Sequence, residues 1–129
     1  MNLEFGRIYI DADEAPAVIE RYAGGMYLYR YDLRLEEPVE TESEDDTPKS
    51  RYSFVEVRLK GYPNRNETIK CLLRKLVTLE DELKLINDFN EAVENDELNS
   101  DDYTNYKKYL EFRKEIKRNV RTDFDNEGY

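Results

Sequence analysis

The side chains with the clearest potential for chemistry are three carboxylates, Asp11, Asp13 and Glu14, which follow an apolar stretch at residues 3–10. Carboxylate oxygens are the ligands that Ca²⁺ and Mg²⁺ prefer. A solvated turn that closes a strand would use the same residue types, and the glycine of a calcium-binding loop is missing. A metal-dependent carboxylate enzyme is one hypothesis, but we predict a plain turn with no metal and no other cofactor.

The chain contains no histidine. Ser-His-Asp and Cys-His catalysis, histidine-containing zinc sites and histidine acid–base chemistry are therefore excluded. The adjacent glycines Gly24 and Gly25 lack the lysine and the spacing of a phosphate-binding loop. The single cysteine, Cys71, lies among apolar residues of an expected helix, which is typical of a buried thiol. This composition favours a protein that is not an enzyme.

Eleven tyrosines and no tryptophan stand out in the composition. Tyr27, Tyr29 and Tyr31 recur at every second position, which places them on one face of an expected strand at residues 26–36. Tyrosine is enriched in protein interfaces because it combines a large ring with a polar tip. The three rings either form a binding surface or pack beneath the helices, and we name them as candidate binding residues.

The last expected helix is basic, with seven basic and two acidic residues at 103–121 and tyrosines between them. Such a helix could clamp single-stranded nucleic acid. However, residues 78–102 carry ten acidic residues and one basic residue, and the whole chain has a net charge of -10. We therefore expect neutralisation between neighbouring helices, and the overall charge argues against a nucleic-acid partner.

Arg113 falls in the middle of an apolar stripe on this last helix, so it needs a partner. We predict that an ion pair joins Arg113 to the preceding acidic helix. We also name Arg113 as a further candidate binding residue. The candidate carboxylates are Glu82, Asp88, Glu91 and Glu94.

The chain of 129 residues is predicted to be a single α+β domain. Alternating polar and apolar residues in the first 60 positions predict a small antiparallel sheet, packed against a C-terminal three-helix segment at 61–121, with a frayed tail at 122–129. The segment Glu36–Ser50 holds seven carboxylates and two prolines, so it is expected to be a flexible acidic loop. No apolar run is long enough to cross a membrane, and nothing marks the start of the chain for export.

One helix of this segment carries a heptad-like series, Leu79, Leu83, Ile86, Asn90 and Val93, after Thr78 as the expected N-cap. A lone polar residue in such a seam often fixes helix register. We predict that the seam forms within the molecule, with a second copy of the chain as the alternative partner.

Residues 54–90 and 103–113 resemble small uncharacterised proteins encoded among phage and prophage structural genes of gut Bacteroidales. The matching features are the Tyr62-Pro63 turn, the run from Thr78 to Asn87, and the spacing Tyr103-x-x-Tyr106-x-x-Tyr109. The resemblance implies a virion component or an assembly adaptor, located in the bacterial cytoplasm or in the virion.

The sequence as a whole thus predicts a non-catalytic protein that binds other proteins. The alternatives are the carboxylate enzyme described above and an acidic mimic of nucleic acid that occupies a basic partner.

Overall fold

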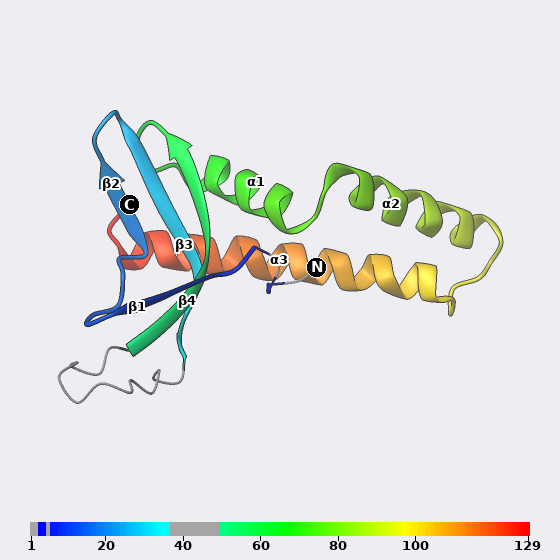
Figure 1. Cartoon of the computed structure of the whole chain (residues 1–129). Helices are drawn as coiled ribbons and strands as arrows, with labels where there is room; N and C mark the ends of the chain where they lie inside the picture. The colour runs from blue at the N-terminus through cyan, green and yellow to red at the C-terminus, as the bar shows by residue number, and fades with distance from the viewer. Residues whose placement is uncertain (1–2, 5, 37–49) are drawn as a thin grey trace. The chain divides into compact units, whose positions relative to one another are not determined.

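The computed structural model describes residues 3–4, 6–36 and 50–129. Among these residues, four strands lie in the N-terminal half and three helices in the C-terminal half. Figure 1 labels each of them, and the arrangement confirms the predicted α+β class. In chain order the elements are β1 (Ile8–Ala12), β2 (Ile19–Tyr22), β3 (Met26–Glu36), β4 (Ser50–Lys60), α1 (Arg65–Leu76), α2 (Leu79–Glu94) and α3 (Asp101–Asn126).

The chain divides into two compact units, where the sequence predicts one domain. The helical unit comprises residues 65–122. The sheet unit comprises the chain up to residue 64 together with residues 123–129, so the last turn of α3 belongs to the sheet unit. The predicted acidic loop lies outside the described residues, apart from Glu36 and Ser50 at its two ends.

The sheet is antiparallel throughout, with the strand order β1-β4-β3-β2. Strand β2 lies at the end of this order and pairs with β3. Ile19 pairs with Tyr29, and Tyr22 pairs with Met26 across a tight turn. Gly24 and Gly25 both have positive φ in that turn, a conformation that glycine adopts without strain.

One face of the sheet forms the core of its unit, where Tyr27, Tyr29, Val55 and Val57 are buried. The ring of Tyr29 lies 5.8 Å, centroid to centroid, from the ring of Phe124, which is also buried. The prediction of a frayed tail is therefore wrong, because α3 continues to Asn126 and its final turn is held by an aromatic contact with the sheet.

Side chains cap the starts of α2 and α3. Thr78 accepts a hydrogen bond from the backbone N–H of Asp81, as predicted, and Ser100 accepts one from Tyr103 at the start of α3. Three carboxylates occupy the first turn of α2, where they complement the helix dipole. None of the described helices has the length and apolar character needed to cross a membrane.

Candidate functional site

Helix α2 exposes a row of aliphatic side chains to solvent. Leu79, Leu83 and Val93 are 55%, 49% and 43% exposed, and Ile86 is half-buried. At 100° per residue these positions share one face, with Asn90 between them. We call these five residues the α2 apolar face. Of the 16 residues of α2 only Ala92 is buried, which is unusual for a helix with this much aliphatic surface.

A different face of α2 packs against α3 through aromatic side chains. The ring of Phe89 lies 5.2 Å from the ring of Tyr103 and 4.4 Å from that of Tyr106, measured between centroids. Further along, the Tyr109 hydroxyl donates a hydrogen bond to Glu82. Later residues of α2 thus meet earlier residues of α3, so the two helices are antiparallel.

The Tyr109–Glu82 hydrogen bond persists across the physiological pH range. Burial of the Tyr109 ring, together with its hydrogen bond to Glu82, raises the pKa of the Tyr109 hydroxyl to about 12. The phenol therefore keeps its proton at neutral pH and remains the donor. The Tyr109–Glu82 hydrogen bond and the contacts of the Phe89 ring hold one side of α2 against α3. The α2 apolar face lies on another side of the helix.

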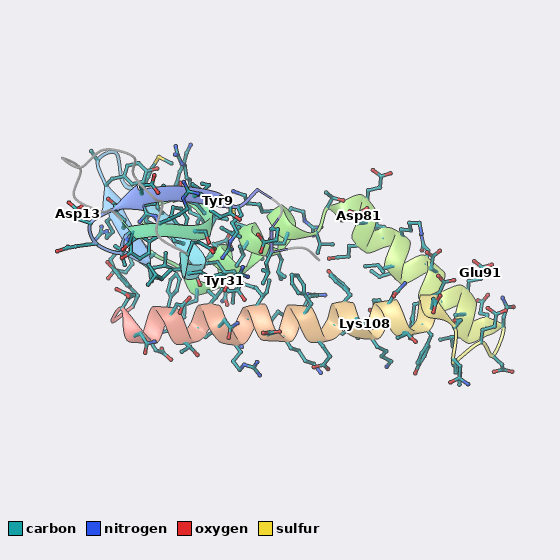
Figure 2. The ribbon with its side chains drawn as sticks, turned by 60° about the horizontal axis from the view of Figure 1, so that its bottom comes forward. Tyr9, Asp13, Tyr31, Asp81, Glu91 and Lys108 are labelled. Atoms are coloured by element: carbon teal, nitrogen blue, oxygen red, sulfur yellow. The ribbon has the colours of Figure 1, made fainter. Side chains whose placement is uncertain are left out.

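Acidic side chains are spread over the rest of the α2 surface. Helix α2 contains six carboxylates and one lysine, and Glu80, Asp81, Glu91 and Glu94 are exposed. Figure 2 places Asp81 and Glu91 on α2 and Lys108 on α3. In the described part of the chain, the ion pairs of the α2 carboxylates are with Lys84 of the same helix and with Arg74 of α1. Helix α2 therefore combines an aliphatic face with a strong negative charge on the rest of its surface.

The predicted intramolecular seam is wrong, although its residues do share one face. The structure uses Phe89 and Glu82 to contact α3, about a quarter-turn or less from Ile86, and leaves the seam residues at the surface. The sequence held a signal for this outcome, since Leu85, Phe89 and Ala92 widen the apolar arc of α2 beyond what one neighbouring helix covers.

Tyr27, Tyr29 and Tyr31 are all buried in the sheet unit. The hydroxyl of Tyr27 accepts a hydrogen bond from the backbone N–H of Asn64 at 3.2 Å, and that of Tyr29 donates to Asp123 at 2.5 Å. The rings of Tyr29 and Tyr31 contact each other. Their burial corrects the binding-surface prediction and supports the alternative that these rings pack in the interior.

Arg113 does not form the predicted ion pair with Glu82, Asp88, Glu91 or Glu94. Instead its guanidinium carbon lies 5.7 Å from the centroid of the Tyr109 ring, within the range of a cation–π contact. Arg113 therefore reaches the acidic helix indirectly, since Tyr109 itself donates to Glu82. The half-buried position agrees with its place in the apolar stripe.

The three carboxylates near the N-terminus do not converge. Asp11 lies on β1 and pairs with Arg51 of β4 at 3.2 Å, and Asp13 and Glu14 are exposed on the following turn. Figure 2 labels Asp13 at that turn. Over residues 3–4, 6–36 and 50–129 the structure contains no group of three or more acidic or cysteine side chains arranged to hold a metal ion.

A buried arginine immediately before β1, Arg7, was not predicted. The side chain of Arg7 has no solvent exposure and donates to the hydroxyl of Ser53 at 3.1 Å and to the backbone carbonyl of Asp32 at 2.6 Å. It also pairs with the Asp32 carboxylate, which bonds Arg34 as well. The cluster therefore ties Arg7 to β3 through Asp32 and to β4 through Ser53.

Protein-family models, curated protein sequences and solved structures were each compared with the chain, and none of them matches it.

Proposed function

We propose that this protein is a non-catalytic interaction protein and that it binds another polypeptide chain through the α2 apolar face. The observation that carries the proposal is the exposure of Leu79, Leu83 and Val93 on a helix whose contacts with α3 are already made by Phe89 and Glu82. Aliphatic side chains in a row at helical spacing are the anchors by which one helix binds in the groove of another.

Two alternatives from the sequence have less support. A carboxylate enzyme would need converging acidic groups, whereas Asp11 is engaged by Arg51. A mimic of nucleic acid would present acidic groups alone, whereas α2 adds a row of aliphatic side chains to its carboxylates. A protein partner accounts for both features of the helix.

The resemblance to Bacteroidales phage proteins extends the proposal to a virion component or assembly adaptor. It rests on the sequence motifs around Tyr62–Asn87 and Tyr103–Arg113. Under this extension the partner is another structural protein of the same particle.

Site-specific photo-cross-linking tests the interaction role. A photoreactive amino acid replaces Leu83 on the apolar face in one variant and Lys84, one position away on the charged side, in a second variant, both expressed in the cells that carry the gene. We expect cross-links to a polypeptide from position 83 that are absent or much weaker from position 84. Equal yields from both positions, or none from position 83, would show that this face does not bind another chain.

A further inference from the structure

We infer that the occupant of the α2 apolar face is a second copy of this chain, and that two α2–α3 hairpins pair as a four-helix bundle in which α2 of each protomer lies beside α3 of its partner. This inference rests on the proposed function, because it names the partner for the same face.

The spacing of the face is that of a helix that packs on other helices. Leu79, Leu83, Ile86, Asn90 and Val93 follow one another at intervals of four, three, four and three residues, which is the alternation of the a and d positions of a heptad. Asn90 occupies an a position, where a single polar residue specifies register and the number of helices. A polar residue at this position suits the face to one particular helical partner.

The length of α2 argues for a bundle instead of a two-stranded coiled coil. Its 16 residues span only two heptads, which is short for two isolated helices in water. A hairpin face about 24 Å long and about two helix diameters wide would bury roughly 1,000 Å² in total over the two protomers, which is at the lower limit for a specific interface. We therefore expect a reversible dimer.

Charge decides which helices lie together. Two α2 helices side by side would bring their six carboxylates each into proximity, with one lysine apiece to offset them. Residues 103–121 of α3 carry seven basic and two acidic side chains, and Lys107, Lys108, Lys114, Arg118 and Arg121 are exposed. In the dimer, each protomer thus places its basic α3 beside the acidic α2 of its partner. Two-fold symmetry makes this contact twice, which closes the assembly at a dimer.

Sedimentation equilibrium of the purified full chain tests the inference. We expect a monomer–dimer equilibrium that weakens at least tenfold in Leu83→Gln and in Val93→Gln. The control Asn87→Gln, which changes an exposed polar residue of the same helix, should retain the parent dissociation constant. Circular dichroism of each variant establishes that α2 remains folded, and the two separate face variants guard against a defect peculiar to one of them.

The salt dependence tests the pairing of α2 with α3 of the partner. Screening weakens attraction between opposite charges and relieves repulsion between like charges. Dimerisation should therefore weaken as ionic strength rises, whereas a dimer strengthened by salt would overturn this arrangement. If the parent chain stays monomeric at every concentration, the inference that a second copy occupies the α2 apolar face is wrong. If position 83 still cross-links to a different protein in cells, the proposed function stands even though the chain does not dimerise.

Discussion

Arg7 shows how a single buried charge supports the sheet unit. Its guanidinium donates to Ser53, to the Asp32 backbone and to the Asp32 carboxylate, so each side of the group is satisfied away from water. Breaking a buried pair from one side leaves the remaining polar groups without a partner. The sequence gives little warning of this role, because Arg7 lies in a short apolar stretch that resembles any edge strand.

We expect Arg7→Ala to lower the free energy of unfolding by about 3–5 kcal/mol, the range for a buried ion pair that loses one member. Urea denaturation measures the change. The matched control is Arg58→Ala, since the Arg58 side chain is 71% exposed and its partner Glu56 also pairs with Arg30. That control should cost no more than about 1 kcal/mol. Similar losses in both variants would contradict a special role for Arg7.

The carboxyl of Asp123 should make stability depend on pH. Burial raises the pKa of Asp123 in the folded chain, and the hydrogen bond from Tyr29 lowers it only in part. The native state then binds more protons than the unfolded state, so this group's contribution is greatest below the unfolded pKa of about 3.9 and is lost as pH rises through the folded value. We expect Asp123→Asn to remove that loss, because an amide oxygen still accepts from Tyr29.

The measurement is urea denaturation of parent and variant from about pH 4 to pH 7, the window that opens at the unfolded pKa of an aspartate. The gain in stability of Asp123→Asn over the parent should grow with pH. Asp13→Asn, which changes an exposed carboxyl on a turn, serves as the control and should follow the parent. A constant difference between Asp123→Asn and the parent across this range would contradict the predicted titration.

At the scale of elements, the alternation of polar and apolar residues predicts strand β3 correctly. It does not predict which side chains of the strand are buried. The sequence places Leu35 on the same face as Tyr31, yet Leu35 is 68% exposed. The cause is a bulge, since Tyr31 pairs with Val55 whereas Arg34 pairs with Ser53, and Asp32 has a φ of 53°. One extra residue reverses the faces of the strand beyond it. The sequence gives no clear signal for the bulge, because the alternation of polar and apolar residues continues through Asp32.

The start of a helix can be predicted well from the sequence, because an N-cap depends only on residues within one turn. Thr78 is the clearest case, and its hydroxyl accepts from the Asp81 N–H at 3.2 Å. We expect Thr78→Ala to cost about 1 kcal/mol and Thr78→Ser to restore most of it. Thermal or urea unfolding checks both variants. Equal losses for alanine and serine would indicate that the methyl group of Thr78, and not its hydroxyl, contributes the stability.

At the scale of the whole molecule, the α+β class follows from local patterns, whereas the partners of each face do not. The periodicity at Leu79–Val93 identifies an apolar face correctly, but it is the same whether the neighbour is α3 or another chain. Likewise the alternation at Tyr27–Tyr31 fits an interface and a core equally well, and only the fold shows that the rings are buried. Sequence periodicity determines which residues share a face, and tertiary packing determines what covers it.

A dimer formed through the α2 apolar face makes thermal stability depend on protein concentration, because association with the native state shifts unfolding by mass action. We expect the Tm of the parent to rise with concentration and that of Leu83→Gln to stay constant. Since Leu83 is 49% exposed within one chain, the two proteins should share nearly the same Tm at the lowest concentration, as surface substitutions usually do. Differential scanning calorimetry over a wide concentration range measures both. A lower Tm for Leu83→Gln at every concentration would instead place Leu83 in the interior of the helical unit.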